Sequence, residues 1–217
     1  MAVTEYARRR IKGLYAITPE TADTGLLLRM ANAALRGGAS VIQYRAKTIA
    51  PDLATVQGMA LAAECRRLDI PFIVNDSVQL AIAVGADGVH IGRDDESVAS
   101  IRRIMPDAIV GVSCYDDMRL AMRAIDEGAD YVAFGSLFPS ATKPLAVRAD
   151  LRLLAEAGRR GMNSVAIGGI TMRNASQVIA AGADAIAVIS ALFENPDADT
   201  ILCHAQQLSQ LFHTCHA

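Results

Sequence analysis

Short apolar segments alternate with helical patterns along the chain, and this alternation constrains the fold more than any other feature. Amphipathic windows separate the apolar segments; within Thr24–Arg36, one face collects Leu26, Leu27, Met30, Ala33 and Ala34. Such regular alternation indicates a parallel sheet covered by helices. The expected strands are Gly13–Thr18, Ser40–Arg45, Pro71–Asp76, Gly88–Gly92, Ile109–Cys114, Tyr131–Gly135, Ser164–Gly169 and Ala185–Ser190.

A short repeat marks the passage from helix to strand. It occurs as Gly37-Gly38-Ala39-Ser40, Gly85-Ala86-Asp87-Gly88, Gly128-Ala129-Asp130 and Gly182-Ala183-Asp184. Glycine ends a helix in the left-handed conformation, and the aspartate supports the turn by bonding nearby backbone. The recurrence of this turn indicates that one strand–helix unit is repeated along the chain. Eight such units with short connections predict a single (β/α)8 TIM barrel over residues 1–217, with an open doubly wound sheet as the alternative.

Composition excludes several classes of protein. Of the 217 residues 52% are hydrophobic, which suits strands buried on both faces. The net charge of -2 and the absence of Trp argue against a nucleic-acid partner. No apolar run approaches the ~20 residues of a membrane span, and no signal peptide is predicted. The four cysteines show no paired spacing, so we expect free thiols and a cytoplasmic location.

Polar residues end the second expected strand, where an active site of this fold lies. The sequence there is Gln43-Tyr44-Arg45-Ala46-Lys47. Alternate residues of a strand share a face, so Gln43, Arg45 and Lys47 are expected to point together. Two cations and an amide suit an anion with several oxygens, such as a diphosphate. The alternative is a solvated strand end with ordinary surface charges.

Carboxylates follow the third and fourth expected strands. Asp76 ends the third, and Arg93-Asp94-Asp95 follows the fourth. Because adjacent strands lie about 4.8 Å apart, a carboxylate from each can converge on one cation. Few carboxylates together with substrate phosphate oxygens favour Mg²⁺. The alternative is helix capping, by Asp76 on residues 77–85 and by Asp94 or Asp95 on residues 97–105.

Three further side chains lie at or near strand ends. His90 is expected to pack inside the barrel more readily than to act in catalysis. Ser113 offers a hydroxyl that could bind a phosphate or complete a turn. Cys114 has no activating partner in the sequence.

A second anion site is expected at the seventh and eighth strands, and a long loop follows the sixth. The loop Phe134–Pro144 is long and rich in hydroxyls, which fits a phosphate-gripping loop or lid, with a solvated surface loop as the alternative. The paired Gly168 and Gly169 allow backbone N–H groups to approach an anion, and Ile189-Ser190 follows the eighth strand. Two anion sites of different chemistry indicate two phosphorylated substrates. The usual signatures of nicotinamide binding, P-loop hydrolysis, zinc proteolysis and serine esterases do not occur.

These motifs, in this order, resemble the thiamine-phosphate synthase family. The resemblance runs from Leu14-Tyr15-Ala16-Ile17-Thr18 to Ile189-Ser190, nearly the whole chain. Each motif is weak alone, but their order and spacing together are specific. The matching motifs are Gln43-x-Arg45-x-Lys47, Asn75-Asp76, Gly88-Val89-His90-Ile91-Gly92 with Asp95, Gly111-Val112-Ser113, Thr142-Lys143-Pro144 and Ile167-Gly168-Gly169-Ile170.

The resemblance implies a transferase that joins hydroxymethylpyrimidine diphosphate to a thiazole or carboxythiazole phosphate, giving thiamine monophosphate and diphosphate. It implies Mg²⁺ bound by Asp76 and Asp95, and a dissociative mechanism without a general base. Arg45, Lys47, Ser113 and Lys143 would be catalytic. The substrate-binding set would be Gln43, Tyr44, Arg45, Ala46, Lys47, Asn75, Ser113, Ser140, Ala141, Thr142, Lys143, Gly169, Ile189 and Ser190.

Two departures and three rival functions accompany this resemblance. Arg93 stands where the family often has Gln, and Ser140-Ala141-Thr142 is a reduced form of a threonine-richer loop. A related thiazole tautomerase would use a histidine just after the sixth strand, where this chain has Ser136. The other two alternatives are a sugar-phosphate isomerase or epimerase and a non-catalytic protein that binds thiamine precursors. Small molecules are the expected partners, and homo-oligomer formation stays open.

Overall fold

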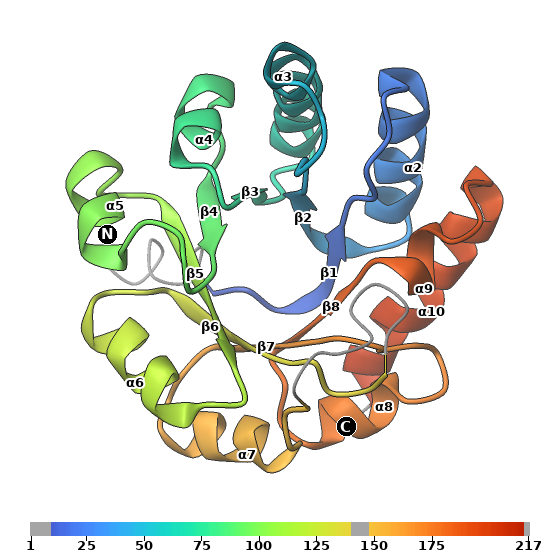
Figure 1. The fold of residues 1–217 in the computed structure, drawn as a ribbon. Helices are drawn as coiled ribbons and strands as arrows, with labels where there is room; N and C mark the ends of the chain where they lie inside the picture. Colours follow the sequence, from blue (N-terminus) through green and yellow to red (C-terminus); the bar gives the residue numbers. More distant parts are fainter. Residues whose placement is uncertain (1–9, 140–147, 215–217) are drawn as a thin grey trace.

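Eight parallel strands pair in chain order, and the first also pairs with the last, so the sheet is a closed barrel (Figure 1). The computed structural model describes residues 10–139 and 148–214. Pairing of Gly13 with Ala185 and of Ala16 with Val188 closes the ring, which excludes the open-sheet alternative and confirms the predicted TIM barrel. The strands are β1 Gly13–Ile17, β2 Ala39–Tyr44, β3 Phe72–Asn75, β4 Gly88–Ile91, β5 Ile109–Tyr115, β6 Tyr131–Phe134, β7 Ser164–Ile167 and β8 Ala185–Val188.

Helices form the outer ring around these strands (Figure 1). The predicted helical window Thr24–Arg36 coincides with the observed helix α2. Within the described residues, no helix has both the length and the apolar character needed to cross a membrane. The helices are α2 Thr24–Arg36, α3 Pro51–Arg67, α4 Val78–Val84, α5 Val98–Ile104, α6 Met118–Asp126, α7 Arg152–Arg159, α8 Ala175–Ala180, α9 Ser190–Phe193 and α10 Ala198–Thr214.

Strand alternation divides the core into two parts. Residues that point outward pack against the helices, while those that point inward fill the barrel. Ile11 closes the interior at the amino ends of the strands, where the Asn163 amide bonds both its N–H and its C=O at 2.8 Å. The interior cluster contains Ile11, Tyr15, Ile17, Val41, Ile73, Ile109, Tyr131, Ala133, Val165, Ala185 and Ala187.

The repeated aspartates do more than support their own turns. Asp87 Oδ2 accepts a hydrogen bond from the N–H of Phe72, at the start of the preceding strand, at 2.8 Å. Asp130 bonds the N–H of Val110 at 2.7 Å, and Asp184 bonds that of Ser164 at 2.9 Å. The sequence predicted bonds to nearby backbone; the structure places them on the neighbouring strand. These aspartates therefore tie adjacent strands together at their amino ends.

Candidate active site

The end of β2 and the segment after β1 form one side of the candidate site. Gln43 is buried and its Nε2 donates to Tyr15 Oη at 2.9 Å. The Arg45 guanidinium pairs with Glu20 at 3.1 Å, and the Arg45 N–H donates to Thr18 Oγ1 at 3.1 Å. Two of the predicted anion-binding side chains, Gln43 and Arg45, therefore each have a defined partner from β1 or its loop.

Glu20 is a site residue that the sequence analysis missed. Its carboxylate accepts hydrogen bonds from the N–H groups of Lys47 at 2.8 Å and Thr48 at 3.2 Å, and from the Thr48 hydroxyl. Burial alone would raise the pKa of Glu20, but these hydrogen bonds and the Arg45 charge outweigh it and lower that pKa. The signal was available, because Glu20 follows the first strand as closely as Lys47 follows the second.

Lys47 and Asp76 meet across the ends of β2 and β3. Lys47 Nζ lies 3.0 Å from Asp76 Oδ2, with the two side chains 51% and 32% exposed. Asp76 has a positive φ of 63°, which ends the strand earlier than predicted, and its N–H donates to the carbonyl of His90 at 2.8 Å. The helix-cap alternative for Asp76 is wrong, because Ser77 caps α4 through its bond from the N–H of Leu80.

Asp95 lies in the loop after β4, next in the barrel to β3. Its Oδ2 accepts a hydrogen bond from the N–H of Gly92 at 2.7 Å, which folds the loop back toward the strand end. The cap alternative for Asp94 and Asp95 is also wrong, since Ser97 caps α5. The guanidinium of Arg93, one of the two departures from the family pattern, lies 5.0 Å from the Tyr115 ring centre.

The donor set at these strand ends can be compared with the needs of Mg²⁺. Within residues 10–139 and 148–214, no group of three or more His, Cys, Asp or Glu side chains is arranged so that it could hold a metal ion. Magnesium does not require one, because it is held by one or two carboxylates plus substrate phosphates and water. Asp76 and Asp95 supply such carboxylates from neighbouring strand ends, and a lysine ammonium already lies against Asp76. The residues present therefore fit a magnesium ion that binds together with a phosphorylated substrate.

The β3, β4 and β5 ends supply an amide, an imidazole and a hydroxyl. Asn75, the last residue of β3, pairs in register with His90 of β4. His90 is 9% exposed, and its Nε2 lies 2.9 Å from Ser113 Oγ. The prediction that His90 packs inside the barrel is confirmed. Ser113 is half-buried near the end of β5, and its hydroxyl contacts His90.

Two residues of the predicted substrate-binding stretch turn away from the barrel interior. The Tyr44 ring is buried in the outer core, and its hydroxyl donates to Gln57 Oε1 at 2.7 Å. Ala46 packs against the same outer core. Any contact of Tyr44 with a ligand in the barrel mouth would therefore come from its backbone. Cys114 is also buried outward, and burial raises the pKa of its thiol to about 12, which agrees with its predicted lack of activation.

The paired glycines after β7 pack tightly against the loop that follows β6. Gly168 and Gly169 have φ values of 97° and 65°. A Cβ on Gly168 would lie 2.2 Å from Ser136 Oγ, and one on Gly169 would lie 2.4 Å from the Pro139 carbonyl. Only glycine fits either position. The pair thereby fixes the start of the β6–α7 loop, in addition to the backbone access predicted from the sequence.

Part of the predicted second anion site lies outside the described residues. Ser140, Ala141 and Thr142 belong to that part, and Lys143, which was predicted to bind the diphosphate, also lies outside. Of the remaining predicted residues, Ile189 is half-buried directly after β8, and Ser190 is exposed at the start of α9. Gly169 lies after the neighbouring strand β7, so these three residues occupy adjacent strand ends.

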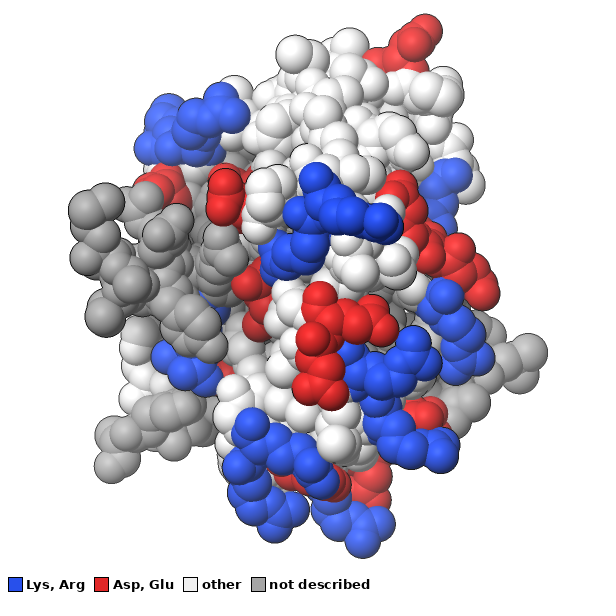
Figure 2. Space-filling view, turned by 90° about the vertical axis from the view of Figure 1, so that its left-hand side faces the viewer, with Lys and Arg blue, Asp and Glu red and all other residues white. Residues whose placement is uncertain are grey.

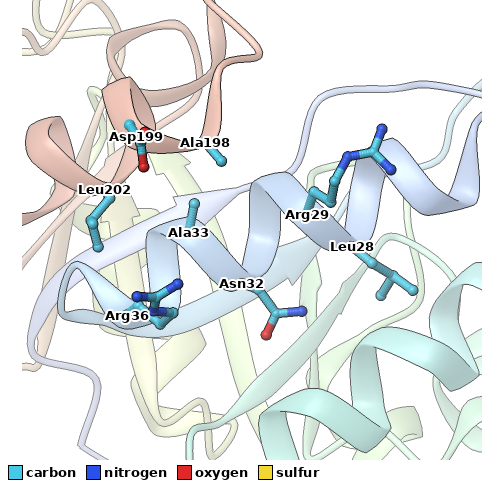
Figure 3. Close-up of a pocket in the computed structure, with 8 residues that line it drawn as sticks. All are labelled: Leu28, Arg29, Asn32, Ala33, Arg36, Ala198, Asp199 and Leu202. Carbon is cyan, nitrogen blue, oxygen red and sulfur yellow. The ribbon is translucent and has the colours of Figure 1, made fainter.

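Two hollows occur elsewhere on the molecule. One of about 300 Å³ lies outside the barrel between α2 and α10, with Arg29, Arg36 and Asp199 at its wall (Figure 3). The other, of about 500 Å³, lies near the amino ends of the strands and includes Arg10 and Asp87. Neither contains a predicted site residue. Figure 2 shows acidic and basic side chains interspersed on the α5–α6 side of the barrel, without a broad field of one sign.

Comparison with known proteins places the chain in a family. Residues 14–192 match the family described as thiamine monophosphate synthase. The chain is 50% identical to the thiamine-phosphate synthase of Methylobacillus flagellatus over 97% of its own length and 100% of that protein. It is 52% identical to that of Methylococcus capsulatus over 93% and 90% of the two chains. A solved thiamine phosphate pyrophosphorylase from Pyrococcus furiosus matches with a TM-score of 0.83 and 32% identity over 96% and 99% of the chains. The chain therefore belongs to the thiamine monophosphate synthase family.

Proposed function

We propose that this chain is a transferase that condenses hydroxymethylpyrimidine diphosphate with a thiazole phosphate, giving thiamine monophosphate and diphosphate. Family membership over residues 14–192 supports the reaction class. One structural observation carries the placement of the diphosphate: Lys47 meets Asp76 at 3.0 Å beside the Arg45–Glu20 pair, so cations and carboxylates converge at the carboxyl ends of β2 and β3. In this fold those ends carry the chemistry.

Charge balance supports a metal at the diphosphate half of the site. Arg45 and Lys47 are each paired with a carboxylate, so part of their charge is already neutralised. A diphosphate carries several negative charges, and two partly neutralised cations compensate it poorly. Asp76 and Asp95 would hold Mg²⁺, which would supply positive charge to the diphosphate oxygens as the carbon–oxygen bond breaks. Lys47 would then turn from Asp76 toward the substrate.

The side chains suit a reaction without proton transfer. We propose that the bond between the pyrimidinylmethyl carbon and the diphosphate oxygen breaks first, with both electrons leaving on the diphosphate. Arg45 and Lys47 stabilise that developing charge. The thiazole nitrogen then donates its lone pair to the carbon cation, and no group has to accept a proton. His90 agrees with this scheme, because both of its ring nitrogens contact protein hydroxyls.

The second half of the site would hold the nucleophile's phosphate. Gly169, Ile189 and Ser190 lie at adjacent strand ends and offer backbone N–H groups and one hydroxyl. Backbone groups carry no formal charge, so this half distinguishes a monophosphate from the more highly charged diphosphate. Ser140, Ala141, Thr142 and Lys143 would complete the binding of the two substrates.

The test is a reconstituted reaction with the purified chain, hydroxymethylpyrimidine diphosphate, thiazole phosphate and Mg²⁺. We expect thiamine monophosphate and diphosphate in equal amounts, product only when both heterocycles are present, and loss of turnover on chelation that added Mg²⁺ restores. A folded chain that binds both heterocycles without turnover would establish the non-catalytic alternative. Conversion of the thiazole compound alone would establish the tautomerase alternative, and either result overturns the proposal.

A further inference from the structure

A continuous chain of hydrogen bonds crosses the barrel interior beneath the candidate site. Gln43 Nε2 donates to Tyr15 Oη at 2.9 Å, and Tyr15 Oη lies 2.9 Å from Tyr131 Oη. Tyr131 Oη lies 3.0 Å from His90 Nδ1, and His90 Nε2 lies 2.9 Å from Ser113 Oγ. The chain thus joins β2, β1, β6, β4 and β5, and both of its ends are predicted substrate-binding residues.

The middle of this chain is sealed from water. Tyr15 and Tyr131 are 1% and 0% exposed, and Gln43 is 3% exposed. Burial raises the pKa of both tyrosine hydroxyls, so each keeps its proton and has one hydrogen bond to donate. A buried hydroxyl proton without an acceptor is unfavourable. Each donor in the chain must therefore point at the next acceptor.

Tyr131 reaches His90 only because β5 carries a glycine between their strands. Gly111 pairs in register with His90 on one side and with Tyr131 on the other. A Cβ on Gly111 would lie 1.9 Å from the Tyr131 ring. The Tyr131 ring therefore occupies the space above Gly111 and stacks with His90 at a centroid distance of 5.6 Å. Side-chain volume, as well as hydrogen bonding, specifies this contact.

The amide at one end sets the direction of the whole chain. Because the Gln43 N–H donates to Tyr15, the Tyr15 proton is directed to Tyr131, and the Tyr131 proton is directed to His90 Nδ1. The imidazole then accepts at Nδ1 and donates its Nε2 proton to Ser113 Oγ. The Ser113 hydroxyl proton consequently faces the barrel mouth.

Reversing the direction of these hydrogen bonds would change what Ser113 presents to the barrel mouth. If the Gln43 amide were rotated so that its oxygen accepted from Tyr15, every proton would reverse and Ser113 would donate to His90. Ser113 would then present only lone pairs to the barrel mouth. Lone pairs repel the oxygens of an anion, whereas a hydroxyl proton attracts them. A site that binds a diphosphate ester favours the first direction.

We propose that Tyr15, Tyr131 and His90 form a positioning relay that holds the Ser113 hydroxyl as a hydrogen-bond donor to the pyrimidine diphosphate substrate. The inference rests on the proposed function for the identity of that substrate. His90 and Tyr131 do not touch the reacting atoms; they act through Ser113. The relay also couples Gln43 and Ser113, so that two groups on opposite sides of the barrel mouth are oriented together.

A double-mutant cycle tests the relay. Tyr131→Phe keeps the ring above Gly111 but removes the hydroxyl that fixes His90. We expect kcat/KM for the pyrimidine diphosphate to fall about 10-fold, with the KM for the thiazole phosphate unchanged. In a Ser113→Ala background, Tyr131→Phe should have no further effect, because Ser113 is the group through which it acts. A full, additive loss in that background overturns the relay.

Tyr44→Phe is the matched control, since it removes an equally buried hydroxyl that bonds Gln57 outside the barrel interior. Its effect, whatever its size, should add to that of Ser113→Ala. Urea unfolding of each variant separates a loss of stability from a loss of orientation.

Nitrogen NMR of the histidine-labelled full chain without substrate tests the direction separately from turnover. We expect the His90 proton on Nε2 and none on Nδ1 in the parent, and a mixture of tautomers in Tyr131→Phe. A proton on Nδ1 in the parent overturns the inference. An inactive parent with the expected tautomer overturns the proposed function but leaves the relay's direction established.

Discussion

The two ends of the barrel use the same residue type in opposite ways. At the amino ends, Asp87 and Asp130 accept from backbone N–H groups of the neighbouring strand, and Asp130 also pairs with Arg102 at 2.5 Å. At the carboxyl ends, Asp76 faces a lysine ammonium and Asp95 faces a single loop N–H. The aspartates at the amino ends are thus tied to strands, whereas Asp76 at the carboxyl ends is tied to a side chain that a ligand can replace.

This difference separates stability from chemistry within one fold. The N–H groups of Phe72 and Val110 are buried and donate to Asp87 and Asp130. Removing the aspartate therefore leaves a buried strand N–H without its acceptor. A lysine side chain that is half exposed can turn to another partner at little cost. Substitutions at the amino ends should therefore change the free energy of unfolding, and those at the carboxyl ends should change turnover.

The largest effect is expected for Arg45→Ala. The guanidinium is the charged donor closest to the end of β2, and its loss removes electrostatic stabilisation of the leaving diphosphate. We expect kcat to fall about 10²–10³-fold, as for removal of one preorganised donor in other enzymes. Steady-state kinetics measure this effect, and urea unfolding should show little change.

Arg119→Ala is the control for Arg45→Ala. Its side chain is 90% exposed at the start of α6, after β5, so the same charge is removed without changing the end of β2. Its turnover should match that of the parent. If both variants lose the same activity, net charge rather than position at the end of β2 is responsible, and the role assigned to Arg45 fails.

The sequence predicted the barrel well because its signals were local and repeated. The Gly-Ala-Asp repeat and strand alternation each depend on a few neighbouring residues, and α2 was predicted with its observed bounds. The role of the aspartates was only partly predictable, because bonding across to Val110 or Ser164 depends on barrel closure. No pattern of local spacing contains that information.

The candidate site was predictable in its members but not in their pairing. Strand ends identified Arg45, Lys47 and Asp76, yet the two ion pairs depend on which loops fold toward each other. Glu20 was missed because it follows a proline and looks like an ordinary loop residue. The capping alternatives for Asp76 and Asp95 failed because a serine closer to each helix, Ser77 or Ser97, serves that purpose.

Asp130→Ala should give a smaller effect, this time on stability. It leaves the N–H of Val110, which is 0% exposed, without its side-chain acceptor and removes the partner of Arg102. We expect the free energy of unfolding to fall by about 2–4 kcal/mol. Urea unfolding measures this loss, and kcat per folded molecule should not change.

Asp130→Asn is the matched variant, because its amide oxygen can still accept from the N–H of Val110 while the charge is lost. We expect it to keep more than half of the free energy of unfolding that Asp130→Ala loses. An equal loss in both variants would show that the ion pair with Arg102, and not the strand tie, stabilises this end of the barrel.

The smallest effect is expected for a pair of aspartates at the two ends of β3. Asp69 and Asp76 both have a positive φ, of 54° and 63°, so asparagine suits either backbone. Asp76→Asn should raise the Mg²⁺ concentration for half-maximal activity about 10-fold, because the proposed metal site would lose one charge. Asp69→Asn, on an exposed turn before the amino end of β3, should leave that concentration unchanged. Magnesium titrations under otherwise identical conditions compare the two directly.

Equal shifts in both variants would mean that the net charge of the protein, and not a specific site, attracts the ion. No shift in either variant would remove Asp76 from the metal site and leave it as the partner of Lys47 alone.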